Sequence, residues 1–202
     1  MVLVSGGGTN LQALLDAQKN LGPGKITLVA SDRPAYALER AKNAGVKTII
    51  VAGERTNIPK NEWRQKISDR ILYLAEINQI DLIVLAGFLS ILTGKIFRYY
   101  SGRIINLHPA LLPKFGGEGM YGENVHRAVL DAGETESGCT VHLVDAGTDT
   151  GPILLQRKVP VLPGDTPDSL AERIHNEEHI AIVEAVKIMT ERLQNEGVKL
   201  IL

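Results

Sequence analysis

Short apolar runs alternate with helix-like segments through the first half of the chain, and this alternation limits the possible folds more than any other feature. The runs predict five strands, at residues 2–4, 26–30, 47–51, 82–85 and 103–105. Helical patterns fall between them, at residues 11–17, 35–44, 60–79 and 93–100. Because parallel strands need crossover connections that are usually helices, this order predicts an α/β fold with a Rossmann-like, doubly wound and mostly parallel sheet.

The second half of the chain predicts an antiparallel addition to this sheet. Strands are expected over residues 139–144 and 153–159, and the short turn between them favours an antiparallel pair. A helix with Asn124 as its N-cap is expected over residues 125–132. A long helix should run from residue 165 to residue 195, with a short strand at 199–202. The sequence has no repeat, low-complexity segment or linker, so we expect residues 1–202 to form a single domain.

The composition argues against several classes of protein. The 202 residues carry 22 Lys and Arg against 23 Asp and Glu, so no basic excess favours nucleic acid as a partner. The start lacks the basic and apolar segments of a signal peptide, and no apolar run has transmembrane length. Cys139 is the single cysteine, so no internal disulfide can form. We therefore expect a cytoplasmic protein with no membrane partner, in which Cys139 belongs to the core.

A glycine-rich loop follows the first predicted strand. Ser5-Gly6-Gly7-Gly8-Thr9-Asn10 joins this strand to a helical stripe, with Thr9 or Asn10 as the expected N-cap. Free backbone N–H groups and the helix dipole both favour an anion at such a loop, and the glycines let a phosphate approach closely. The loop lacks the Lys-Ser/Thr of a P-loop and the full dinucleotide spacing. The alternative is a tight turn that packs the helix on the sheet.

Two polar side chains stand where the fifth predicted strand meets Pro109. Asn106 and His108 are two residues apart, so in an extended segment they point to the same side. Pro109 has no N–H to donate, and we expect the regular strand to stop before Asn106. An amide donor and an imidazole at one point suit a carbonyl substrate in acyl transfer. The alternative is an Asn and a His that cap a turn.

Three separate segments follow strand ends in this prediction. They are the glycine loop, Gly87-Phe88-Leu89 and the Asn106–His108 pair. Ligands of doubly wound sheets bind beyond the carboxyl ends of the strands, so one shared cleft is expected. Residues 115–124, with four glycines, form a candidate mobile loop over this cleft.

For several other polar residues, the sequence allows more than one role. Asp149, in a glycine-rich turn, is either an Asx-turn residue or a carboxylate that raises the His108 pKa. Glu178 interrupts an apolar helical stripe, and its partner is either a ligand amine or a structural Arg or Lys. His175 and His179 have zinc-site spacing, but Asn176 replaces the catalytic Glu of that motif, which argues against a metal. Arg64 suits an anionic ligand or an exposed helix face.

With these residues in view, the chain resembles the folate-dependent phosphoribosylglycinamide formyltransferase family. The matching motifs are Ser-Gly-Gly-Gly-Thr-Asn-Leu-Gln at 5–12, Leu-Ala-Gly-Phe-Leu-Ser-Ile-Leu at 85–92, Asn-Leu-His-Pro-Ala-Leu-Leu-Pro at 106–113 and Thr-Val-His-Leu-Val-Asp…Asp-Thr-Gly-Pro-Ile at 140–153. The resemblance implies transfer of a formyl group from 10-formyltetrahydrofolate to the amine of glycinamide ribonucleotide, in purine biosynthesis. It implies no metal, and a monomer or homodimer.

The resemblance also implies a role for each part of the cleft. The catalytic trio would be Asn106, His108 and Asp149, with Asp149 keeping His108 protonated. The residues supporting this trio would be His142, Pro109 and Pro113, with a cis Leu112–Pro113 bond. The residues binding the ribonucleotide would be Gly8, Thr9, Asn10, His175 and Glu178. The folate pocket would comprise Arg64, Leu89, Ser90, Ile91, Leu92, Asp145, Ala146, Gly147 and Thr148. Ser90 stands where the family often has a basic residue, which would weaken contact with the folate tail.

Three alternatives differ in substrate or class. A methionyl-tRNA formyltransferase normally carries a further C-terminal RNA-binding domain, and a formyltetrahydrofolate hydrolase normally carries an N-terminal regulatory domain. We expect neither addition here, because the chain ends near residue 202 and the glycine loop starts at residue 5. A non-catalytic nucleotide-binding module would use only the glycine loop and leave Asn106, His108 and Asp149 without a purpose.

Overall fold

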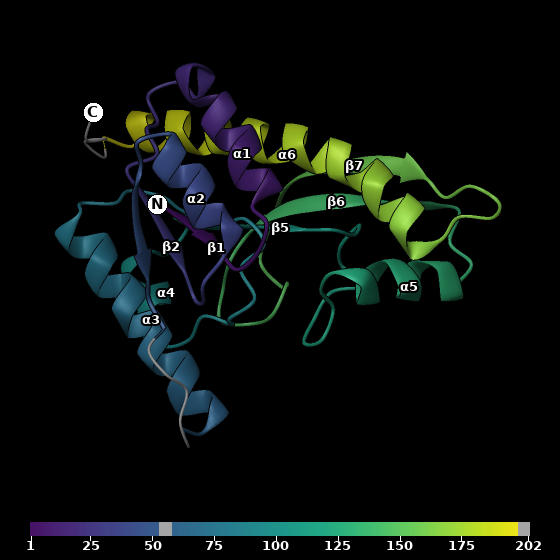
Figure 1. The fold of residues 1–202 in the computed structure, drawn as a ribbon, viewed down its shortest axis with the longest axis horizontal. Helices are drawn as coiled ribbons and strands as arrows, with labels where there is room; N and C mark the ends of the chain where they lie inside the picture. Colours follow the sequence, from purple (N-terminus) through teal and green to yellow (C-terminus); the bar gives the residue numbers. More distant parts are fainter. Residues whose placement is uncertain (53–57, 198–202) are drawn as a thin grey trace.

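A seven-stranded sheet forms the centre of the computed structural model, which describes residues 1–52 and 58–197 (Figure 1). Its strand order is β3-β2-β1-β4-β5-β6-β7. The strands are β1 (Val2–Val4), β2 (Leu28–Ser31), β3 (Lys47–Ile50), β4 (Ile83–Leu85), β5 (Ile104–His108), β6 (Glu136–Leu143) and β7 (Ile153–Pro160). Strands β1 to β5 pair in parallel, and β6 and β7 are added antiparallel. The predicted fold class and the antiparallel pair are confirmed.

Helices cover both faces of the sheet and separate two apolar cores. They are α1 (Thr9–Asp16), α2 (Tyr36–Asn43), α3 (Lys60–Ile77), α4 (Ile96–Tyr99), α5 (Glu123–Asp131) and α6 (Pro167–Asn195), with a 3-10 turn η1 (Gln18–Asn20). One core joins α1, α2, α5 and α6 to one face, and the other joins α3 and α4 to the opposite face. Side chains alternate between faces along a strand, so Val2 and Val4 enter the first core and Leu3 enters the second. Among the described helices, none combines the length and the apolar character that a membrane crossing requires.

Strand β5 is longer than its sequence predicts. It continues through Asn106 to His108, so the expectation that regular pairing stops before Asn106 is wrong. Asn106 lies opposite Leu85 of β4 and His142 of β6, and His108 lies opposite Thr140 of β6. Pro109 then follows the last paired residue, where its missing N–H costs no ladder bond.

Two predicted helix caps are also wrong. The N-cap of α1 is Gly8 with φ 75°, and no side chain caps this helix, so neither Thr9 nor Asn10 has that role. The N-cap of α5 is Gly122, and Asn124 lies inside the helix. In both places a glycine adopts a positive φ that turns the chain into the helix, which a side chain would oppose. The predicted strand at 199–202 lies outside the described residues.

The buried strand β1 offers a test of the two-layer packing. Leu3 is fully buried in the core beneath α3, so Leu3→Ala should lower the free energy of unfolding by about 2–5 kcal/mol. Urea unfolding followed by circular dichroism measures this change. Ile77→Ala, at a side chain that is 56% exposed, is the matched control and should cost far less. Equal losses in the two variants would contradict the packing described.

Candidate active site

A cavity of about 700 Å³ opens at the carboxyl ends of β1, β4 and β5. It is lined by residues 6–10, 85–92, 106–109, 117–122 and 147–149, with contributions from α3, α5 and α6. The three predicted strand-end segments therefore meet in one place, as expected for a doubly wound sheet. Cys139 is fully buried in the core away from this cavity, as predicted.

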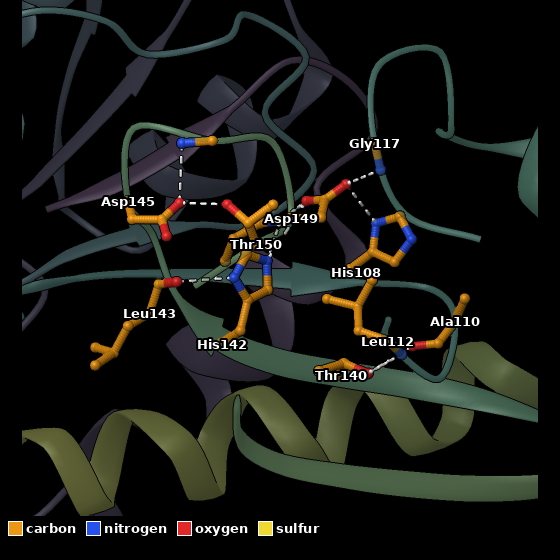
Figure 2. Close-up of polar contacts among 12 residues, drawn as sticks. His108, Ala110, Leu112, Gly117, Thr140, His142, Leu143, Asp145, Asp149 and Thr150 are labelled. Atoms are coloured by element: carbon orange, nitrogen blue, oxygen red, sulfur yellow. Dashed lines mark hydrogen bonds and ion pairs between the residues drawn. The ribbon is translucent and has the colours of Figure 1, made fainter. Parts of the chain in front are cut away.

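Asn106, His108 and Asp149 converge at the floor of the cavity. Figure 2 shows His108 next to Asp149. His108 Nδ1 lies 3.6 Å from Asp149 Oδ2, and Asn106 Nδ2 donates a long hydrogen bond of 3.4 Å to Asp149 Oδ1. β5 supplies the first two side chains, and the turn after β6 supplies the third. The structure thus brings together three groups that the spacing in the sequence could not place.

His142 supports this group from the neighbouring strand. Its Nδ1 lies 2.8 Å from the Leu143 carbonyl, which can only accept, so Nδ1 carries the proton of the neutral ring. The Nε2 atom then accepts a hydrogen bond from Asn106 Nδ2 at 3.1 Å. This bond fixes the orientation of the Asn106 amide, so that its N–H₂ group, and not its oxygen, faces Asp149.

His108 is buried and has a fixed tautomer when neutral. Its Nε2 lies 2.8 Å from the Phe115 carbonyl, so Nε2 donates and Nδ1 is left facing Asp149. Burial lowers the pKa of His108 below its ordinary value, although Asp149 and the Phe115 carbonyl act in the opposite direction. Asp149 therefore acts on the His108 pKa in the expected direction, but the effect of burial is larger than that of the carboxylate.

Asp149 remains a carboxylate in this setting. Burial alone would raise its pKa, but the adjacent His142 ring, the hydrogen bond from the Gly117 N–H and the nearby His108 ring together hold the pKa below its usual value. Gly117 N donates to Asp149 Oδ2 at 3.0 Å. Asp149 itself has φ 58°, in the left-handed region that Asp tolerates better than most residues.

Residues 115–122, here termed the capping loop, connect His108 and Asp149 to helix α3. A Cβ on Gly116 would lie 2.6 Å from Leu112 Cδ2 and 3.2 Å from Asp149 Cβ, so only glycine allows the loop to approach this closely. At its tip, Glu118 Oε1 lies 2.7 Å from both Lys60 Nζ and Arg64 Nη2. Hydrogen bonds from these two cations lower the pKa of Glu118 to about 2.

The turn after His108 is held by two side chains that the sequence analysis missed. Thr140 Oγ1 donates to the Ala110 carbonyl at 2.6 Å and accepts from Leu112 N at 3.0 Å. Gln156 Nε2 donates to both the Leu112 carbonyl and Thr140 Oγ1 at 2.9 Å. The Leu112–Pro113 bond is cis, as predicted. These bonds fix the path of the chain directly after His108.

Glu178 lies at the other end of the cavity, close to the glycine loop. The residue is 5% exposed, and its Oε2 accepts from Asn10 Nδ2 at 3.2 Å. His175 Nε2 lies 3.9 Å from the same oxygen. Among the described residues, no Arg or Lys pairs with Glu178, so the structural-cation alternative receives no support. Asn10 Oδ1 is buried without a partner in the described part of the chain, which leaves it available to a ligand.

The remaining predicted site residues lie mostly where the sequence suggested. The cavity-lining members are Gly8, Thr9, Asn10, Arg64, Leu89, Ser90, Ile91, Leu92, Pro109, Asp145, Gly147 and Thr148. Ala146 and Pro113 do not line the cavity. Ser90 Oγ donates to buried Asp32 at 2.7 Å, and Asp32 also pairs with Arg33, whose side chain reaches the cavity. A cation therefore stands close to the position that lacks a basic residue.

His126 is a cavity residue that the sequence analysis did not identify. It lies on α5, is 4% exposed, and its Nδ1 has no partner among the described residues. Burial lowers its pKa, and nearby His175 and His108 lower it further. Its sequence signal is weak, because an isolated histidine in an amphipathic helix usually belongs to the core or the surface.

Comparison with known proteins identifies the class to which this fold and site belong. The family model described as "Formyl transferase" matches residues 1–186. Phosphoribosylglycinamide formyltransferase of Escherichia coli (strain K12) is 39% identical over 89% of this chain and 81% of its own length. This chain therefore belongs to the formyl transferase family.

Three further proteins are similar to this chain to different degrees. The glycinamide ribonucleotide transformylase 1 structure from Symbiobacterium toebii has a TM-score of 0.84 and 40% identity, covering 94% of this chain and 86% of that one. The trifunctional purine biosynthetic protein adenosine-3 of Drosophila melanogaster is 40% identical over 93% of this chain, which spans only 14% of that protein. A formyltetrahydrofolate deformylase from Pseudomonas syringae, 21% identical with a TM-score of 0.81, shares the fold.

The coupling between Asp149 and His108 can be measured directly. Because the Asp149 carboxylate raises the His108 pKa against the effect of burial, Asp149→Asn should lower that pKa further. NMR titration of the histidine ring signals reports the change. Asp145→Asn is the matched control, since Asp145 bonds to Gly147 and Thr150 within its own turn. An unchanged His108 titration in Asp149→Asn would reject the coupling.

Proposed function

We propose that this chain transfers the formyl group of 10-formyltetrahydrofolate to the primary amine of glycinamide ribonucleotide. The products are formylglycinamide ribonucleotide and tetrahydrofolate, and the reaction belongs to de novo purine biosynthesis. The observation that carries this proposal is the meeting of Asn106, His108 and Asp149 between an anion-binding loop and a cation-lined opening. The names of the relatives at 38–40% identity support the same reaction.

The two ends of the cavity suit the two substrates. At one end, the backbone N–H groups of Gly8, Thr9 and Asn10 suit the phosphate, and Glu178 with His175 suits the ribose or glycinamide groups. At the other end, Leu89 to Leu92 offer apolar surface for the pterin and the aromatic part of folate, with the turn at 145–149 on the opposite side.

Cations at the open end suit the carboxylates of the folate tail. Arg33, Lys60 and Arg64 all line this end of the cavity. Lys60 and Arg64 each pair with Glu118, and a substrate carboxylate would replace that pairing. Arg33 would offset the missing basic side chain at Ser90.

Catalysis begins with attack of the ribonucleotide amine on the formyl carbon. The formyl oxygen gains negative charge as the new C–N bond forms, and the Asn106 amide stabilises it by donating a hydrogen bond. The long 3.4 Å bond from Asn106 to Asp149 is the weaker of its two contacts, so this N–H is the one available to the substrate.

The proton of the attacking amine must then reach the leaving nitrogen of the folate. Neutral His108, with Nδ1 unprotonated, can accept this proton, and the Asp149 carboxylate stabilises the resulting imidazolium. Return of the proton to the folate nitrogen completes the transfer as the old C–N bond breaks. The lowered pKa of His108 suits this cycle, because the ring starts neutral and becomes charged only while it carries the proton.

We further propose that the protein acts in the cytoplasm, without a metal, nucleic acid or membrane partner, as a monomer or homodimer. The single buried Cys139 and the balanced charge support this setting. A transfer assay with glycinamide ribonucleotide, against a control without acceptor, tests the proposal. Formyl-group hydrolysis without acceptor would instead support a deformylase, and no turnover in either reaction would support a binding module.

His108→Ala should remove most of the turnover. We expect kcat to fall by about 10²–10⁴-fold with little change in the KM for the ribonucleotide, because the ring acts on the transferred proton. Steady-state assays of tetrahydrofolate release provide both constants. His179→Ala, at a histidine that does not line the cavity, is the control. Normal turnover by His108→Ala would refute the mechanism.

Glu178→Gln should act mainly on ribonucleotide binding. The amide oxygen can still accept from Asn10, but the negative charge at the buried end of the cavity is lost. We expect the KM for glycinamide ribonucleotide to rise by about tenfold, with a smaller change in the KM for the folate. Glu177→Gln is the matched control, because Glu177 pairs with Arg157 outside the cavity. A rise confined to the KM for the folate would contradict the assignment of Glu178 to the ribonucleotide end of the cavity.

A further inference from the structure

Arg40 connects helix α2 to the glycine loop from behind. Its Nε donates to the Gly7 carbonyl at 2.8 Å, and its Nη1 donates to Gln12 Oε1 at 3.1 Å. Its guanidinium carbon lies 5.1 Å from the centre of the Tyr36 ring. Arg40 is not among the residues that line the cavity, so it reaches the loop on the side opposite to any ligand.

The carbonyl groups of the three glycines in the loop each accept a hydrogen bond from a group that does not face the cavity. Gly6 O accepts from Ala37 N at 3.1 Å, and Gly8 O accepts from Gln12 N at 2.9 Å. Both of these donors are backbone groups. Gly7 O, in the middle, has the Arg40 side chain as its donor. The orientation of this central peptide group thus depends on one side chain, whereas its neighbours are held by secondary structure.

The donor groups of the loop are left for a ligand. Among the described residues, the N–H groups of Gly7 and Gly8 have no backbone acceptor. Thr9 and Asn10 begin α1, whose first N–H groups have no partner within the helix, and no side chain caps them. If a loop carbonyl rotated toward the cavity, its negative end would face the phosphate. Binding therefore requires that the carbonyl groups stay on the side of the loop away from the cavity.

Close packing makes α2 a rigid support for this arrangement. Gly8 has φ 75°, and a Cβ at this position would lie 2.5 Å from Ala37 Cβ, so the loop backbone rests directly on the first turn of α2. Arg40 follows Ala37 by three residues and lies on the same side of the helix. One helix therefore sets both the position of the loop and the orientation of its central peptide.

We propose that Arg40 is a positioning residue for recognition of the substrate phosphate. It fixes the Gly7 carbonyl away from the ligand and places a permanent positive charge directly behind the loop that receives a dianion. This inference rests on the proposed function for the identity of the substrate. In this role, Arg40 favours the phosphorylated form of the substrate and does not contact the reacting atoms.

The test compares a phosphorylated and an unphosphorylated acceptor. In Arg40→Met, kcat/KM for glycinamide ribonucleotide should fall by about 10–100-fold, mainly through KM, because the lost interaction is made equally before and during the reaction. For glycinamide ribonucleoside, which lacks the phosphate, kcat/KM should be unchanged within about threefold. Arg40→Lys, which keeps the charge, should recover part of the loss. Arg70→Met is the matched control, because Arg70 stacks similarly on Tyr73 outside the cavity.

Two outcomes overturn the inference. Equal losses for both acceptors in Arg40→Met would indicate a general structural role, and no loss for either would indicate no role. If the wild-type protein fails to formylate the ribonucleotide, the proposed function fails, but titration with inorganic phosphate still tests Arg40. NMR should then show shifts of the amide signals of residues 6–10 in the wild type and at least tenfold weaker phosphate binding in Arg40→Met. Equal phosphate affinity in both proteins would refute the role of Arg40.

Discussion

Strand β5 pairs in opposite directions with its two neighbours, and the candidate active site depends on this pairing. Its parallel contact with β4 places its carboxyl end beside the other strand ends, where the cavity lies. Its antiparallel contact with β6 places Asn106 opposite His142 and His108 opposite Thr140. A change of strand direction within one sheet thus brings side chains of β5 and β6 to the same place.

Electrostatics gives this small group of side chains its chemical character. The Asp149 carboxylate is ionised in a partly buried position, because two histidines, an amide and a backbone N–H surround it. Burial opposes a positive charge on His108 and lowers its pKa, while the adjacent Asp149 carboxylate acts in the opposite direction. The site therefore holds one permanent negative charge and one position where a positive charge can form beside it. Such an arrangement stabilises a transient cation without a solvent rearrangement.

The sequence predicts the parts of this structure that depend on local pattern. Apolar runs and helical stripes locate the strands, and the position of Asn106 and His108 before Pro109 indicates a polar strand end. It does not predict that β5 continues through those residues, because the partners come from β4 and β6. The sequence also does not predict that the pKa of His108 is lowered, because desolvation depends on how the rest of the protein packs around the ring. Helix caps at Gly8 and Gly122 depend on loop paths that tertiary contacts impose.

The hydrogen bond between Asn10 and Glu178 joins two residues that are 168 positions apart in the chain. Helix α6, which carries Glu178, also packs on α1, directly after the glycine loop. During synthesis, the amino-terminal strands and helices leave the ribosome long before α6 does. The pocket around Asn10 is therefore completed only after most of the chain has been translated, and a nascent chain that stops before α6 leaves the apolar face of α1 uncovered for chaperones to bind.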